Sequence, residues 1–259
     1  MKQSTNFEGD LSIHYAFLLV MLTAVFSFPQ AGGAQAASGV SGTFAAPHGT
    51  DLALGDSCYT ITTGTDGKEQ PIGYVFQSLT NDHLDGVDVL TVVVHQHLLT
   101  KKFDMRDRLV LRKADLTPLR LDTDRDGSPH VHLDYTLGRV TGWKMVAGAK
   151  QPIDVALDGK VWDGNLWGVT FAALPLKAGA NFHLPVYQYD SGKGEFFVTV
   201  VGKQKVTTPT GAVEAWVTEV GLKSDERVKY LLGQKPRMEL GYVAGPMSQH
   251  LGGDCGGLH

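Results

Sequence analysis

The chain has 259 residues, of which 42% are hydrophobic and 19% charged, and its formal net charge is −4. This composition supplies enough apolar material for one sizeable core. The sequence has no basic run and no Lys/Arg-rich face, which argues against nucleic acid as a partner.

The first residues have the pattern of a secretory leader. Residues 15–28 are an apolar run of 14 residues, and Ala34-Gln35-Ala36 follows as a small-x-small cleavage site. Because a membrane-spanning helix needs roughly 20 residues, the run predicts a signal peptide over residues 1–36 and a periplasmic or secreted mature protein. Lys2 is the only base before the run, and Glu8 and Asp10 oppose it, so an upstream start or a retained anchor stays open as the alternative.

The rest of the chain divides into three parts. Residues 37–55 predict a linker, residues 56–243 an antiparallel β domain, and residues 244–259 a Gly-rich tail. In the β domain, alternating runs recur at roughly 8 to 12 residues with Gly, Asn or Asp between them, which predicts an all-β meander forming a barrel or half barrel. The predicted strands include residues 58–63, 72–79, 87–98, 102–113, 116–124, 130–137, 139–146, 153–162, 226–233 and 236–243.

A long hairpin is predicted over residues 194–220, at the centre of the sheet. Phe196 and Val198 project to one face of its first strand and Phe197 to the other, because successive strand side chains alternate. Thr208-Pro209-Thr210-Gly211 supplies the turn between its two strands.

One segment departs from the strand pattern. Residues 163–174 begin with Asp, have apolar residues about a helical turn apart, and are followed by Pro175, which predicts a short helix or lid. Its aromatic residues either plug the barrel as core or line a pocket for an apolar ligand. The candidate ligand-binding residues are Trp162, Trp167, Phe171, Phe197 and Trp216.

Two histidine pairs are the candidates for metal binding. His95 and His97 lie two residues apart in one predicted strand, and His130 and His132 in another, so each pair is expected to share a face. If the strands met, four imidazoles would be available to a divalent metal, the one cofactor that the sequence suggests. The alternative is that all four are half-exposed strand residues without a ligand.

Other catalytic and metal-binding patterns are weak. Residues 122–127, DTDRDG, resemble the first half of a calcium loop, but Leu133 stands where that loop needs a bidentate Glu. The nucleophile elbow, the zinc-protease helix motif and the phosphate-binding loops are all absent from the sequence. An enzyme is therefore the less favoured interpretation.

The only two cysteines, Cys58 and Cys255, lie near the ends of the mature chain. In an oxidising compartment a lone pair of this kind is expected to form a disulfide bond.

The sequence also resembles a bacterial family of exported β-proteins known as domain of unknown function 3108. The resemblance spans residues 55–243 and is carried by LTPL at 116–119, GRVTG at 138–142, TTPTG at 207–211 and AWV at 215–217. It implies a periplasmic antiparallel sheet or half barrel, similar to envelope carriers that hold lipid-like ligands in a concave face. These motifs are structural, so the resemblance assigns no catalytic residue, and neither histidine pair belongs to its pattern.

The favoured hypothesis is a non-enzymatic periplasmic binding or carrier protein for an apolar or amphipathic small molecule of the cell envelope. Membrane contact is expected only through the leader or through envelope components. A metal-dependent enzyme built on the histidine pairs and a structural envelope protein without a ligand are the alternatives. The oligomeric state stays open.

Overall fold

The computed structural model describes residues 46–64, 67–99, 103–223 and 226–259. All of them belong to one compact unit, residues 42–259. The predicted signal peptide and residues 37–45 of the predicted linker lie outside the described residues.

The described residues form fifteen strands, one α-helix and one short 3-10 helix. Their bounds are η1 Gly49–Asp51, β1 Gly55–Thr63, β2 Gln70–Leu84, β3 Val87–Leu98, β4 Phe103–Arg112, β5 Pro118–Arg125, β6 Ser128–Thr136, β7 Arg139–Val146, β8 Ala149–Ala156, β9 Trp162–Asp163, α1 Gly168–Ala172, β10 Asn181–Gln188, β11 Gly192–Thr208, β12 Gly211–Gly221, β13 Val228–Gln234, β14 Arg237–Ala244 and β15 Met247–Leu251.

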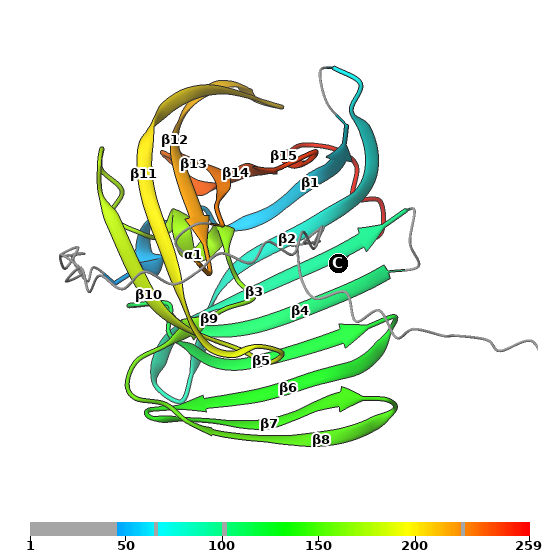
Figure 1. Ribbon diagram of the computed structural model, residues 1–259, viewed down its shortest axis with the longest axis vertical. Helices are drawn as coiled ribbons and strands as arrows, with labels where there is room; N and C mark the ends of the chain where they lie inside the picture. Colours follow the sequence, from blue (N-terminus) through cyan, green and yellow to red (C-terminus); the bar gives the residue numbers. More distant parts are fainter. Residues whose placement is uncertain (1–45, 65–66, 100–102, 224–225) are drawn as a thin grey trace, which may run out of the picture. The chain divides into compact units, whose positions relative to one another are not determined.

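These strands make one sheet in the order β8-β7-β6-β5-β4-β3-β2-β1-β15-β14-β13-β12-β11-β10-β9 (Figure 1). Two meanders, β1 to β8 and β9 to β15, meet where β1 pairs with β15, and only β9 and β10 run parallel. Since β8 and β9 stand at opposite ends of the order, the sheet does not close. The prediction of an all-β antiparallel meander with one short helix is confirmed, in its half-barrel form.

The predicted hairpin exists as β11 and β12, joined at Thr208 and Gly211. It does not lie at the centre of the sheet, because β1 takes the middle of the strand order. Phe196 and Val198 are buried, whereas Val201 on the opposite face is 51% exposed. Only one face of the hairpin therefore contributes to the core.

The helix is shorter than the predicted range of residues 163–174. Asp163 is part of β9, and the Gly164 N–H donates to the Tyr187 carbonyl, so this backbone pairs with β10 and cannot turn helical. The helix α1 begins only at Gly168, and all its residues are buried. Figure 1 shows α1 within the curl of β10–β14, in contact with β13 and β14. No helix among the described residues has the length and apolarity to cross a membrane.

The described parts of the predicted linker and tail are integrated into the domain. Leu52 is buried and bridges to Arg237 of β14. Within the predicted tail, β15 pairs with both β1 and β14. The predicted disulfide bond between Cys58 and Cys255 is confirmed, with a separation of 5.7 Å between the two Cα atoms. It fastens the segment after β15 to β1.

Candidate functional site

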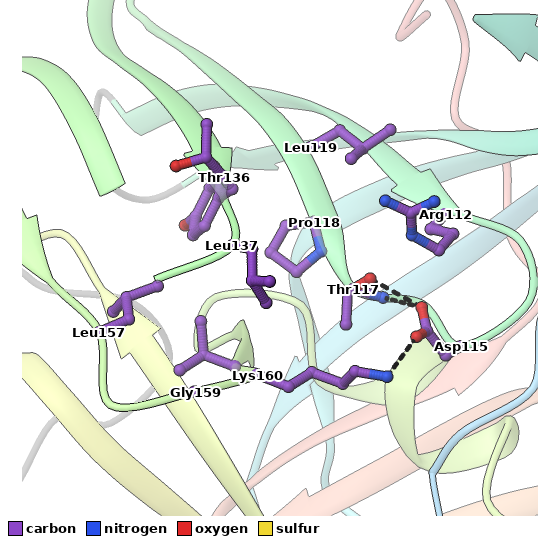
Figure 2. A pocket seen from close by; sticks show the side chains of 12 residues that line it. Arg112, Asp115, Thr117, Pro118, Leu119, Thr136, Leu137, Leu157, Gly159 and Lys160 are labelled. Carbon is purple, nitrogen blue, oxygen red and sulfur yellow. Dashed lines mark hydrogen bonds and ion pairs between the residues drawn. The ribbon is translucent and has the colours of Figure 1, made fainter. Parts of the chain in front are cut away.

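A hollow of about 190 Å³ lies at one rim of the sheet, where three segments meet (Figure 2). The β4–β5 turn, the β6–β7 turn and the connection after β8 supply its walls. Its lining residues are Arg112, Asp115, Thr117, Pro118, Leu119, Tyr135, Thr136, Leu137, Leu157, Gly159, Lys160 and Val161.

Asp115 holds these segments together. Its carboxylate accepts from the Thr117 N–H at 3.1 Å and from the Thr117 hydroxyl at 2.7 Å, which fixes the β4–β5 turn. The Lys160 ammonium reaches the same carboxylate at 2.7 Å, and the Trp162 indole N–H donates to the Asp115 backbone carbonyl at 2.8 Å. Figure 2 shows the carboxylate between Thr117 and Lys160.

The ionisation of Asp115 determines the charge of the hollow. Burial raises the pKa of this carboxyl, but the hydrogen bonds from Lys160 and Thr117 outweigh burial and hold the pKa below its usual value. Asp115 is therefore a carboxylate at neutral pH, and it compensates the charge of Lys160.

Arg112 differs from Lys160 in having no such partner. Among the described residues, none forms a hydrogen bond or ion pair with its guanidinium, which Figure 2 shows beside the hollow. Arg112 also lines a second hollow of about 450 Å³ together with Thr50, Gly86, Val87, Asp88, Lys113 and Ala114. A guanidinium offers several donors in a planar fork suited to carboxylate or phosphate.

The opposite wall of the hollow is apolar. Pro118, Leu119 and Leu157 line it, and Leu137, at the tip of the β6–β7 turn, is 93% exposed. A site with an apolar wall and one uncompensated cation suits an anionic amphipathic group. The Asp115 carboxylate is already engaged by Thr117 and Lys160.

The predicted ligand-binding residues do not line this hollow. Trp162 and Phe171 are fully buried, and Trp167 packs against Phe196 with 4.7 Å between ring centroids, so these three belong to the core. Trp216 lies half-buried at the margin of the core under the Lys203 ammonium.

Phe197 lies on the other face of the sheet from the core. It contacts the His183 ring at 4.9 Å between centroids and the Arg227 guanidinium at 5.5 Å. The five residues are therefore divided between core, margin and outer face and do not form one pocket. Of the two interpretations offered for the aromatic residues around α1, core or pocket lining, the core position is the one that Trp162, Trp167 and Phe171 have in this structure.

His95 and His97 share a face, as the alternation predicts. Both rings contact one carboxylate, that of Asp104: His95 Nε2 lies 2.9 Å from Oδ1 and His97 Nδ1 lies 3.0 Å from Oδ2. Burial raises the pKa of Asp104, but the hydrogen bonds from the two imidazoles lower it further than burial raises it. The pair therefore forms a hydrogen-bonded cluster with Asp104 on the outer side of β3 and β4.

The second pair does not share a face. The β5–β6 register shifts between Thr123 and Asp124, so His130 is the extra residue of a β-bulge. His130 turns toward Tyr189, while His132 on the outer face lies between Asp122 and Asp134.

The two pairs are also separated in the sheet, because β4 and β5 lie between β3 and β6. The four imidazoles are not brought to one point. In the part of the chain that the structure describes, no group of three or more His, Cys, Asp or Glu residues is arranged to hold a metal ion.

The calcium-like sequence is a strand and a turn. Asp122 and Asp124 belong to β5, and Asp126 and Gly127 form its hairpin turn, with φ of 50° and 72°. The Asp-Gly pair is the residue choice that a two-residue hairpin turn requires.

The fold is an all-β domain built on one open, largely antiparallel sheet, with a small hollow at its rim. The chain belongs to the family described as "Protein of unknown function (DUF3108)", which matches residues 58–243. No curated protein matches the sequence. Among solved structures, a β-barrel-like protein of domain of unknown function DUF1849 from Brucella abortus is similar at 10% identity and a TM-score of 0.45, over 80% of this chain and 95% of that one.

Proposed function

We propose that this protein is a non-enzymatic binding protein of the cell envelope that takes an anionic, amphipathic small molecule in the rim hollow. The observation that carries the proposal is Arg112, an uncompensated guanidinium beside an apolar wall. The anionic group of the ligand accepts hydrogen bonds from Arg112, and its apolar part lies against Leu119, Leu137 and Leu157.

The size of the hollow limits what it encloses. Pockets for drug-sized ligands measure roughly 300–1,000 Å³, whereas this hollow measures about 190 Å³. It therefore holds only part of a ligand, such as a short acyl segment next to a carboxylate or phosphate. Within the curl of the sheet, Trp162, Phe171 and Phe196 are fully buried and occupy the core themselves. For this reason the proposed site is at the rim and not in the concave core.

The compartment belongs to the same proposal. A disulfide bond between Cys58 and Cys255 is consistent with an oxidising environment, as in the periplasm or outside the cell. The apolar run at residues 15–28 supports export to that compartment.

Calorimetric titration of the oxidised, mature protein with octanoate, octyl phosphate, octanol and octylammonium tests the proposal. We expect the two anions to bind and the alcohol and the cation to bind at least tenfold more weakly, since hydrogen bonds to charged groups contribute about 1.5–3 kcal/mol. Arg112→Gln should remove that preference.

Arg120→Gln is the matched control, because Arg120 is held by Asp134 at 3.0 Å on the outer face. It should leave binding unchanged. Equal affinity for the anions and the cation, or an unchanged preference in Arg112→Gln, contradicts the proposal. No binding of any probe would favour the hypothesis of a structural envelope protein.

A further inference from the structure

A buried carboxyl group lies at the contact between α1 and the sheet. Glu239 of β14 is only 6% exposed. Gln249 of β15 donates to its carboxyl from Nε2 at 2.9 Å, and the described residues provide no other hydrogen bond to it. Within the described part of the chain no cation offsets its charge, so ionisation would leave a negative charge in the core with one neutral donor.

The surroundings of this carboxyl come from four other elements. The titratable groups that face it are the phenols of Tyr59 on β1, Tyr230 on β13 and Tyr242 on β14 itself. The Tyr59 hydroxyl donates to the Glu239 backbone carbonyl at 3.1 Å, so it does not serve the carboxyl. On α1 the neighbour is Gly168, where an added Cβ would overlap the Glu239 carboxyl. The carboxyl therefore rests directly on the first residue of the helix.

The helix covers an aromatic part of the core at this point. Phe171 contacts Tyr230 and Phe196, with ring centroids 5.3 and 5.1 Å apart, and Trp167 stacks on Tyr230 at 6.3 Å. Five residues are too few for a helix to be stable alone, so α1 depends on these contacts and on its fit against Glu239. Anything that weakens the fit loosens the helix.

We propose that α1 is a lid whose closure requires a neutral Glu239 carboxyl, and that ionisation of Glu239 releases the lid and exposes the aromatic rings beneath it. This device is independent of Arg112 and of the rim hollow. It gives Phe196 and Tyr230, which Phe171 of the lid covers, a second role, because rings that are core in the closed state line an apolar site in the open state.

The direction of the pH effect follows from the burial of Glu239. Burial raises the pKa of this carboxyl from 4.5 to about 7, although the hydrogen bond from Gln249 opposes the shift. The closed state thus binds the proton more tightly than an open state in which Glu239 meets water. Closure is strongest below pH 4.5, weakens as the pH rises toward 7, and changes no further above that value.

Hydrogen exchange of peptides covering residues 164–176, corrected for the intrinsic rate at each pH, measures the opening. Between pH 5 and pH 7 the opening constant should rise roughly fortyfold in the native protein, since the slope approaches a factor of ten per pH unit only between the two pKa values of 4.5 and about 7. Glu239→Gln should show no such slope. Glu219→Gln, an exposed acid on β12, is the matched control and should keep the native profile.

A second variant keeps the test decisive if Glu239→Gln fails to fold. Gln249→Leu removes the donor that lowers the pKa of Glu239, so the midpoint of the pH profile should move upward. A purely structural role of Gln249 would lower protection at every pH without moving the midpoint. The proposal is overturned by pH-independent protection of residues 164–176, by a slope that persists in Glu239→Gln, or by an equal loss of protection in β3, which would indicate global unfolding.

Discussion

At the scale of single residues, the Asp115 carboxylate holds the segments of the rim hollow together. Asp115→Asn keeps the shape of the side chain but loses the charge that holds Lys160 and the Thr117 turn. We expect the free energy of unfolding to fall by about 1.5–3 kcal/mol at pH 7, the range for hydrogen bonds to a charged group. Urea unfolding followed by fluorescence measures the change.

The same substitution has a defined pH dependence. The pKa of Asp115 is lower in the folded protein than its ordinary value of 3.8, so its contribution is present above that value and is lost as the pH falls through the folded pKa. The difference between the native protein and Asp115→Asn should therefore shrink in acid. Asp154→Asn, which breaks the exposed pair with Arg139, is the control and should leave stability unchanged. A similar loss in both variants would argue against the role of Asp115.

At the scale of elements, the seam between β1 and β15 joins the two meanders. The Cys58–Cys255 bond links positions 197 residues apart and fastens this seam. Replacing both cysteines with serine should lower the free energy of unfolding by about 4 kcal/mol, because a long loop is released in the unfolded chain. Denaturant unfolding of the oxidised protein and of the double variant provides the comparison, and treatment with a reductant should reproduce the variant. An unchanged unfolding midpoint would contradict this expectation.

The sequence pattern predicts most of these elements. Residues 87–98 and 139–146 are β-branched and aromatic-rich runs bounded by turn residues, and they correspond to β3 and β7 with the same bounds. The predicted strand at residues 153–162 is wrong in its bounds, because β8 covers 149–156 and β9 begins only at Trp162. Two further strands, β10 and β15, escape the pattern altogether. Pro185 interrupts β10, which tolerates it because β9 pairs with β10 only at Val186 and Tyr187. The strand β15 buries Gln249 instead of an apolar residue, so its alternation is not hydrophobic.

The candidate site could not be predicted from the sequence, for a different reason. The rim hollow forms only when residues 112–119, 135–137 and 157–161 meet in the fold, and no spacing along the chain indicates that meeting. The Asp115-x-Thr117 turn was the one local signal. The bulge that turns His130 away from His132 is likewise set by strand pairing, which the i, i+2 rule does not include.

At the scale of the whole sheet, β8 is an edge strand, because the sheet does not close and β8 pairs only with β7. The β7–β8 turn has two residues, Ala147 and Gly148, so Val146 and Ala149 form the first hydrogen-bonded pair. By alternation, the backbone of Gln151 faces β7 and that of Pro152 faces outward. Pro152 has no N–H to offer there, which blunts the edge against another strand.

Pro152→Val restores an outward donor on the exposed edge and adds strand propensity. We expect this variant to self-associate more strongly than the native protein, as a sedimentation coefficient that rises with concentration. Gln151→Val is the matched control, because it adds the same propensity at a position whose N–H already bonds to β7. If Pro152→Val sediments like the native protein, or if Gln151→Val associates equally, an outward N–H at this position is not what governs association, and the charged neighbours Lys150 and Asp154 protect the edge instead.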